Sequence, residues 1–225
     1  LAQFLEKMGA TVRGAGTPEI RVLGTEHLHG TEHTIIPDRI EAATYALATA
    51  ACGGDVTLQN CLVDHLPGFW DQLKAVGISV REHDVETVEI IAPQSYRMTP
   101  VSVHTAPYPG FATDMQPQLM AFLLKVPGVH LISERVFENR LGHAQELRRL
   151  GAKIVADQRV ALIYGGHALT GAVVRAADLR AGAALMIAGL QANGETVIRG
   201  REVIERGYES FDERLCSLGA NVIAR

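Results

Sequence analysis

The feature that most constrains the fold of this 225-residue chain is a repeated pattern, in which a helical segment ends at a glycine and a strand-like segment follows. The glycine of this pattern recurs at Gly9, Gly77, Gly151 and Gly219, so the repeating unit has about 70 residues. A repeat that combines helices and strands predicts a fold built from several similar α/β units.

A second pattern lies between the copies of the first and consists of an aspartate, an apolar helix, a glycine and a short strand. It starts at Asp38, Asp114 and Asp178. The helices that follow these aspartates are apolar nearly all round, so we expect them to be buried and to pack against one another at the centre. The helices of the first pattern are amphipathic, as in the segment with Trp70 and Leu73, and should lie outside, between sheets.

Copies related by a pseudo-threefold axis would point the amino ends of the three apolar helices at one face. The amino end of a helix carries partial positive charge and free N–H donors, so this face suits anions, and phosphates above all. Four arginines could strengthen such a site, because a guanidinium grips phosphate or carboxylate with two parallel hydrogen bonds. They are Arg39, Arg140, Arg180 and Arg206.

Asp114 is the candidate for catalysis, because it follows a rigid loop and stands at the mouth of one of these helices. Two prolines and Gly110 prevent regular structure and stiffen the loop. Thr113 or Asp114 is expected to cap the helix over residues 118–126. Capping alone would give Asp114 a structural role, whereas the rigid loop and the matching positions of the other two aspartates favour a functional one.

Composition excludes several classes of function. The formal net charge is -4 with acidic and basic residues interspersed, so no basic stripe is available for a nucleic-acid backbone. With 47% hydrophobic residues the chain can form a core, but no apolar run approaches the roughly 20 residues of a membrane span, and no signal peptide opens it. We therefore expect a soluble, cytoplasmic protein with no nucleic-acid or membrane partner.

The cysteines and histidines indicate no cofactor and no metal. Cys52, Cys61 and Cys216 contain no C-x-x-C pair and are expected to be reduced, small, buried side chains. The His-Leu-His segment at residues 27–29, followed by His33, has a ligand-like spacing. No acidic or cysteine partner is near it in the sequence, so we expect no metal site.

The amino terminus reads as the middle of an amphipathic helix, with Leu1, Phe4, Leu5 and Met8 on one face and no capping residue before them. No initiating methionine is present. We therefore expect the chain to be a piece of a longer protein.

Five motifs follow one another along the chain. They are Ile36-Pro37-Asp38-Arg39-Ile40-Glu41, Thr113-Asp114-Met115-Gln116, Val136-Phe137-Glu138-Asn139-Arg140, Ala177-Asp178-Leu179-Arg180 and Arg206-Gly207-Tyr208-Glu209. In this order they closely resemble the motifs of the UDP-N-acetylglucosamine 1-carboxyvinyltransferase family, the enolpyruvyl transferases that begin peptidoglycan synthesis. The resemblance covers essentially the whole chain.

The resemblance implies an α/β fold of two inside-out barrel-like domains, each made of three βαβαββ units around internal helices in pseudo-threefold arrangement. It places residues 1–35 in the tail of the first enolpyruvyl transferase domain. Residues 36–225 are then most of the second domain.

The resemblance also implies a reaction, in which the 3′-hydroxyl of UDP-N-acetylglucosamine adds to C2 of phosphoenolpyruvate, C3 is protonated and phosphate leaves. Asp114 matches the carboxylate that binds the sugar hydroxyl and takes its proton, which requires an ionised acceptor. Val136 matches a residue whose backbone holds the UDP-sugar, and Phe137 and Arg140 line the same region. Arg206 resembles the arginine that clasps phosphoenolpyruvate.

Four further residues are implied to support substrate binding. Asp178 and Arg180 resemble supporting residues on the phosphoenolpyruvate side, and Asp38 and Arg39 would lie at the hinge side of the cleft. The structural alternatives at the hinge side are a helix cap for Asp38 and a solvated charge for Arg39.

Part of the family's catalytic apparatus has no match here. Its Lys-Asn pair, its further phosphoenolpyruvate-binding arginines and the loop with its reactive cysteine all precede the first residue of this sequence. None of Cys52, Cys61 and Cys216 lies in a matching loop. The chain is therefore expected to bind substrate poorly and to be inactive without the missing amino-terminal domain.

Two other functions remain open. The enzyme 5-enolpyruvylshikimate 3-phosphate synthase shares the fold and the chemistry but acts on shikimate 3-phosphate; residues 113–116 and 137–140 favour the nucleotide-sugar enzyme. A stand-alone domain of this fold that binds a ligand without catalysis is the second alternative, and the unmatched amino-terminal half supports it.

Overall fold

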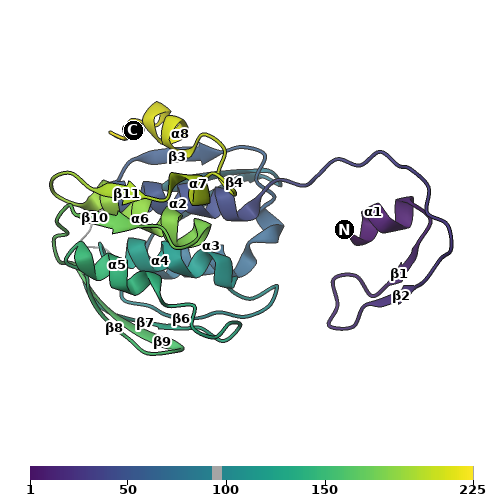
Figure 1. Ribbon diagram of the computed structural model, residues 1–225, viewed down its shortest axis with the longest axis horizontal. Helices are drawn as coiled ribbons and strands as arrows, with labels where there is room; N and C mark the ends of the chain where they lie inside the picture. The colour runs from purple at the N-terminus through teal and green to yellow at the C-terminus, as the bar shows by residue number, and fades with distance from the viewer. Residues whose placement is uncertain (93–97, 225) are drawn as a thin grey trace. The chain divides into compact units, whose positions relative to one another are not determined.

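The computed structural model describes residues 1–92 and 98–224, and the chain divides into two compact units, Leu1–Pro37 and Asp38–Arg225 (Figure 1). The first unit contains helix α1 (Ala2–Lys7) and an antiparallel pair of strands, β1 (Thr11–Arg13) and β2 (Arg21–Leu23). These elements follow the first copy of the repeat, in which a helix ends near a glycine and a strand begins.

In its described residues, the second unit carries three sheets. The first is antiparallel, with strand order β3 (Asp55–Leu58), β5 (Thr87–Ile91) and β4 (Ser79–Asp84). The second has the order β6 (Ser102–His104), β7 (Gly128–Ser133), β9 (Val160–Gly165) and β8 (Lys153–Ala156), and only its β6–β7 pair is parallel. The third is a parallel pair, β10 (Val173–Arg175) and β11 (Val197–Arg199).

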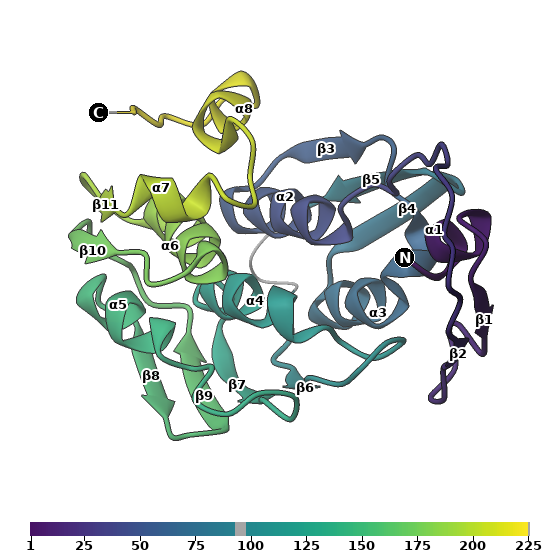
Figure 2. The ribbon, with the colours of Figure 1, turned by 45° about the vertical axis from the view of Figure 1, so that its right-hand side comes forward.

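Three helices lie inside these sheets: α2 (Arg39–Cys52), α4 (Gln116–Leu123) and α6 (Leu179–Gln191). They contact one another, and Figure 2 shows them side by side with the sheets arranged around them. Every residue of α4 is buried, as are most residues of the other two. The predicted burial is confirmed, and the fold is the inside-out α/β arrangement that the resemblance implies.

The amphipathic helices lie between the sheets, as the first repeat pattern predicts. Helix α3 (Pro67–Val76) buries Trp70 and Leu73 and packs on β4, and α5 (His143–Arg149) contacts both β8 and β10. Each is followed within two residues by a glycine with positive φ, 108° at Gly77 and 88° at Gly151, a conformation that a side chain would strain.

The last copy of that pattern departs from the prediction. After the one-turn α7 (Arg201–Ile204), α8 (Phe211–Ser217) ends near Gly219 as expected. Residues 220–224 then form no strand. A strand requires a neighbouring strand with which to exchange hydrogen bonds, and in the described part of the chain these residues have none.

Two of the three aspartates cap their helices. Asp38 accepts a hydrogen bond from the Ile40 N–H at 2.8 Å, and Asp178 accepts from Arg180 and Ala181, each at 2.8 Å. Each cap contributes about 1 kcal/mol to stability.

The predicted cap by Thr113 or Asp114 is wrong. Both residues lie inside a 3₁₀ turn, Thr113–Met115, that runs directly into α4, and neither makes a capping hydrogen bond. The helix also begins two residues earlier than predicted and ends at Leu123 rather than at residue 126. Because its first turn is 3₁₀, the Asp114 side chain is left to make other contacts.

The cysteines are unpaired, as predicted, but only Cys61 is buried. Cys52 is the last residue of α2 and is exposed there, and Cys216 is exposed on α8. The prediction of burial is therefore wrong for these two, because each lies at the solvent-facing end or side of its helix. No helix in the described residues has the length and apolar character needed to cross a bilayer, and no three of their His, Cys, Asp or Glu side chains are grouped to hold a metal ion.

Candidate active site

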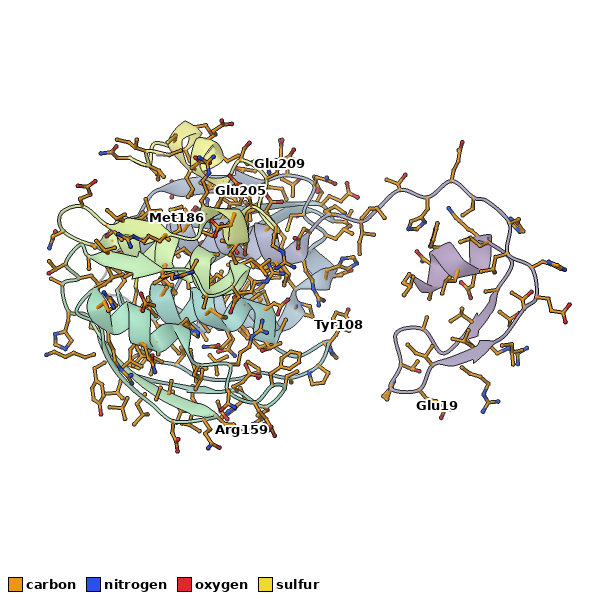
Figure 3. All side chains as sticks on the ribbon, viewed as in Figure 1. Glu19, Tyr108, Arg159, Met186, Glu205 and Glu209 are labelled. Carbon is orange, nitrogen blue, oxygen red and sulfur yellow. The ribbon has the colours of Figure 1, made fainter. Side chains whose placement is uncertain are left out.

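Asp114 is reached through a closed loop over residues 105–112. The Ala106 N–H donates to the Phe111 carbonyl and the Gly110 N–H to the Pro107 carbonyl, each at 2.9 Å. A side chain at Gly110 would bring its Cβ within 2.6 Å of the Ala106 Cβ, so the closure needs glycine there. The tip of the loop carries Tyr108, which is labelled in Figure 3 and donates to the Asp64 carbonyl at 3.2 Å. The predicted rigid loop is confirmed.

The Asp114 carboxylate lies between two arginines. Arg140 Nη2 is 2.7 Å from Oδ1, and Arg180 Nη2 is 3.2 Å from Oδ2. These three residues, called the Asp114 cluster below, carry one negative and two positive charges. The Asp114 side chain is 38% exposed, more than either arginine, so the carboxylate is accessible to a ligand from the solvent side. The excess positive charge suits an anionic ligand.

Arg140 comes from the segment that follows β7. Its guanidinium lies over the ring of Phe137, 5.2 Å from the ring centre, a distance at which the cation and the aromatic face attract each other. Phe137 and Val136 are both exposed beside it. The segment is tied at its outer side by an ion pair between Glu138 and Arg159, at 2.8 Å (Figure 3 labels Arg159).

A buried glutamate joins this segment to the Asp114 loop. Oε1 of Glu134 accepts hydrogen bonds from the Thr105 hydroxyl and from the N–H groups of Val136 and Phe137, at 2.8, 2.8 and 3.0 Å. Oε2 accepts from the Thr113 hydroxyl at 2.7 Å. Burial raises the pKa of Glu134, but the four hydrogen bonds outweigh burial, so the pKa lies below its ordinary value. The charged form of Glu134 therefore fixes both loops.

His143 lies at the start of α5, behind Arg140. It is buried, and its Nε2 has no hydrogen-bond partner among the described residues. Burial lowers the pKa of His143 to about 4, against an opposing effect of Asp178 and of a hydrogen bond with the Arg140 backbone. The imidazole is therefore neutral at pH 7 and adds no charge beside the Asp114 cluster.

A second set of polar side chains lies behind Arg180. Arg180 Nη1 donates to the Tyr208 hydroxyl at 3.2 Å, and that hydroxyl is 3.0 Å from the Thr44 Oγ1. Gln118 Nε2 donates to both hydroxyl oxygens, at 3.1 Å to Tyr208 and 3.3 Å to Thr44. We call these four residues the hydroxyl network; its Thr44, Gln118 and Tyr208 are fully buried.

The hydroxyl network brings the amino ends of the three central helices together. Thr44 is in the second turn of α2, Gln118 in the first turn of α4 and Arg180 in the first turn of α6. Hydrogen bonds between these residues require the three helix starts to lie at one place, as the aspartate repeat predicts. Their partial positive charges add to those of the two arginines there.

The remaining predicted site residues lie outside the Asp114 cluster. Asp178 is engaged as the cap of α6. Arg39 begins α2, where its Nη1 donates to the His65 carbonyl at 3.4 Å and its guanidinium lies 6.0 Å from the ring centre of Tyr108. Arg206 is exposed on the turn between α7 and α8. The structure therefore joins Asp114, Arg140 and Arg180 directly, and places Asp38, Arg39 and Arg206 at other positions.

Sequence reasoning assigned no role in the site to seven residues around the cluster, which are Thr44, Thr105, Thr113, Gln118, Glu134, His143 and Tyr208. A usable signal existed for Thr44 and Gln118, because a polar residue inside a helix that is apolar all round must find a buried partner. No comparable signal marked Glu134, because the four groups that donate hydrogen bonds to its carboxylate come from two separate loops.

The chain matches known proteins along most of its length. Residues 1–215 match the family described as EPSP synthase (3-phosphoshikimate 1-carboxyvinyltransferase). The chain is 47% identical over 222 residues to UDP-N-acetylglucosamine 1-carboxyvinyltransferase 2 of Carboxydothermus hydrogenoformans, covering 99% of this chain and 53% of that protein. It is 47% identical over 223 residues to UDP-N-acetylglucosamine 1-carboxyvinyltransferase of Desulfofundulus thermocisternus, covering 99% of this chain and 90% of that protein.

A solved structure shares the fold. The enolpyruvyl transferase NikO from Streptomyces tendae superposes with a TM-score of 0.85 at 30% sequence identity, over 97% of this chain and 52% of that chain. The chain thus spans about half the length of this protein and of the Carboxydothermus relative.

Proposed function

Because the chain belongs to the EPSP synthase family, and within it to the UDP-N-acetylglucosamine 1-carboxyvinyltransferases, we propose that it supplies one wall of an enolpyruvyl transferase active site. The reaction is the transfer of the enolpyruvyl group of phosphoenolpyruvate to the 3′-hydroxyl of UDP-N-acetylglucosamine, the first committed step of peptidoglycan synthesis. The observation that carries this proposal is the exposed Asp114 carboxylate, held on both oxygens by Arg140 and Arg180 at the joined helix starts.

The proposed role of Asp114 is to accept the proton of the sugar hydroxyl as its oxygen bonds to C2 of phosphoenolpyruvate. A general base must be ionised and held within hydrogen-bond reach of the proton, and the two arginines hold it in a fixed direction. Once C3 has gained a proton, a tetrahedral intermediate has formed; the C2–O bond to phosphate then breaks, and C3 loses a proton so that the C2–C3 double bond of the enolpyruvyl group is restored. We assign the proton donor for C3 to the amino-terminal domain that the resemblance implies.

The two substrates carry anionic groups that the site suits. We propose that Val136 and Phe137 contact the nucleotide sugar beside Arg140; because the Val136 N–H is engaged by Glu134, its carbonyl is the backbone group offered to the sugar. Arg206 is proposed to bind the phosphate of phosphoenolpyruvate, with Arg180 and Asp178 in support. Asp38 and Arg39 are proposed to act at the edge of the cleft.

The three unpaired cysteines fit a reducing compartment, and we propose that the enzyme works in the cytoplasm with no metal or other cofactor.

A chimera tests the proposal. This chain would replace the region of the Carboxydothermus hydrogenoformans protein that it matches, and phosphate release would be measured with both substrates. We expect release that requires phosphoenolpyruvate and UDP-N-acetylglucosamine together, and a loss of about 100-fold or more in kcat for Asp114→Asn. The matched control is Asp55→Asn on the exposed strand β3, which should leave kcat unchanged.

Two outcomes would contradict the proposal. Saturation by shikimate 3-phosphate, with no response to UDP-N-acetylglucosamine, would assign the chain to 5-enolpyruvylshikimate 3-phosphate synthase. Micromolar binding of UDP-N-acetylglucosamine to the 225-residue chain by calorimetry, with no turnover in the chimera, would indicate a ligand-binding domain without catalysis.

A further inference from the structure

We propose that Tyr208 is a positioning residue for this site: its hydroxyl, locked by Thr44 and Gln118, fixes Arg180 against Asp114 and thereby sets the direction in which Asp114 presents its carboxylate. The catalytic consequence rests on the proposed function. The geometry itself can be measured without any substrate.

The hydrogen-bond directions around Tyr208 follow from the donors that are present. The Thr44 hydroxyl donates to the Ile40 carbonyl at 2.8 Å, so its oxygen is left to accept. Arg180 Nη1 and Gln118 Nε2 can only donate, and both point to the Tyr208 oxygen. The Tyr208 proton must then go to Thr44. The Tyr208 hydroxyl therefore has its donor and both acceptor positions filled, and rotation about its C–O bond would break at least one bond.

The Tyr208 ring is fixed as firmly as its hydroxyl. It is 1% exposed and stacks on Phe211, with ring centres 4.8 Å apart and an angle of 25° between the planes. The Arg180 guanidinium lies over the same Tyr208 ring, 5.8 Å from the ring centre. Arg180 thus contacts Tyr208, a side chain that is fixed in one orientation. The second terminal nitrogen of Arg180, Nη2, donates to Asp114 Oδ2.

Tyr208 also anchors the turn that carries Arg206. Gly207 lies between Arg206 and Tyr208 and is so close to Leu179 that a Cβ at Gly207 would be 2.3 Å from the Leu179 Cδ1. The Arg206–Tyr208 turn is therefore pressed onto the first turn of α6, next to Arg180. Tyr208 connects the proposed phosphate-binding arginine with the proposed base through one rigid side chain.

Two variants separate the hydroxyl from the ring. Tyr208→Phe removes only the network oxygen. Tyr45→Phe is the matched control, because Tyr45 packs edge-on against the same ring, Phe211, at 5.6 Å, and among the described residues its hydroxyl makes no hydrogen bond to the network. If Tyr208→Phe does not fold, Thr44→Val replaces it: this change keeps the Tyr208 hydroxyl but removes the acceptor of its proton.

The first measurement is made on the 225-residue chain without substrate. NMR would follow hydrogen exchange of the Arg180 Nη–H groups, assigned with Arg180→Lys. We expect exchange to become about tenfold faster in Tyr208→Phe, as for loss of one buried hydrogen bond, and to stay at the wild-type rate in Tyr45→Phe. An Arg180 exchange rate unchanged in Tyr208→Phe would overturn the proposal.

The second measurement uses the chimera. Tyr208→Phe should lower kcat about tenfold while KM for UDP-N-acetylglucosamine stays within about twofold, because orientation of the base is lost and not the sugar contacts. A rise in KM with unchanged kcat would overturn the positioning role. If the unaltered chimera releases no phosphate, the proposed function fails, whereas the exchange measurement still decides the role of Tyr208.

Discussion

At the scale of single residues, the site contains a buried acid that stays charged and a buried base that stays neutral. Glu134 is charged and fully hydrogen-bonded, and His143 is neutral with one ring nitrogen unpartnered among the described residues. Their pKa values are both lowered, but a lowered pKa preserves the charged form of an acid and the neutral form of a base. Because the unfolded chain binds more protons than the folded chain at both groups, acid destabilises the fold through each of them, below pH 4.5 at Glu134 and below pH 6.5 at His143.

Glu134→Gln should lower the free energy of unfolding by about 2 kcal/mol at pH 7, because an amide cannot accept the four hydrogen bonds that the carboxylate accepts. The pKa of Glu134 is lower in the folded than in the unfolded chain, whose value is near 4.5, so its contribution is complete above pH 4.5 and is lost as pH falls through the folded value. Urea denaturation between pH 7 and pH 3 measures this. Glu138→Gln, at an exposed surface ion pair, is the control and should change stability by less than about 0.5 kcal/mol. A difference that stays constant with pH would contradict the expectation.

His143→Asn should remove a pH dependence that the wild type shows between pH 6.5 and about 4. In this window the unfolded chain binds a proton on His143 and the folded chain does not, so acid favours unfolding. We expect the wild type to lose on the order of 1–3 kcal/mol more than the variant as pH falls across the window. His104→Asn, on an exposed position of β6, is the control. Parallel stability curves for wild type and His143→Asn would show that the imidazole is not neutral in the folded state.

At the scale of elements, the site depends on how closely strand β9 approaches the end of α4. A Cβ at Gly165 would lie 2.0 Å from the Val126 carbonyl oxygen and 2.3 Å from that of Leu123. Both are backbone atoms, which cannot turn aside as a side chain can. The sheet that carries the Asp114 and Arg140 loops therefore meets the central helix through a glycine.

Gly165→Ala should destabilise the chain by about 3 kcal/mol, because the strand must move away from the helix. Gly142→Ala is the matched control: it has open space around its Cβ and a φ of -58°, so it should change stability by less than about 0.5 kcal/mol. Thermal and urea unfolding compare the two. Equal stabilities of the two variants would show that the strand and helix are not in contact at this point.

The elements were predictable where one local pattern decided them. The predictions of apolar helices after Asp38 and Asp178 were correct, because the capping aspartate and the apolar run that follows it indicate the same helix start. The start of α4 was not, because the 3₁₀ turn at Thr113 replaces the cap and depends on Glu134, which binds Thr113 from another loop. The strand after Gly219 failed for a similar reason: alternation suggests a strand, but only a pairing partner makes one.

At the scale of the whole molecule, the hydrophobic core belongs to the second unit. All residues of the core cluster lie between Ile40 and Leu215, so none comes from the first unit. The division predicted from the resemblance, after residue 35, remains a proposal about domains, whereas the compact units divide after Pro37.

A shortened chain beginning at Ile36 should therefore unfold cooperatively, with a free energy of unfolding within about 0.5 kcal/mol of that of the 225-residue chain. Starting at Ile36 retains Asp38 as the cap of α2. Chemical denaturation followed by circular dichroism measures both chains. Loss of the cooperative transition in the shortened chain would show that residues of the first unit contribute to the core.

The candidate site was predictable in part at this scale. The resemblance selected Asp114, Arg140 and Arg180. The two arginines lie 26 and 66 residues from Asp114 in the sequence, and in the structure each forms an ion pair with it. It did not select the side chains that orient them, because Thr44, Gln118 and Tyr208 are recognised by their mutual distances, which a sequence does not contain.

Because residues from three helix starts share the Tyr208 hydroxyl, the substitutions that such a chain can accept during evolution are restricted. Thr44, Gln118 and Tyr208 lie in distant parts of the sequence, yet a change at any one leaves the others with an unmet hydrogen bond at a buried position. A lineage could replace them only in concert, so we expect these three positions to vary together among descendants or not at all.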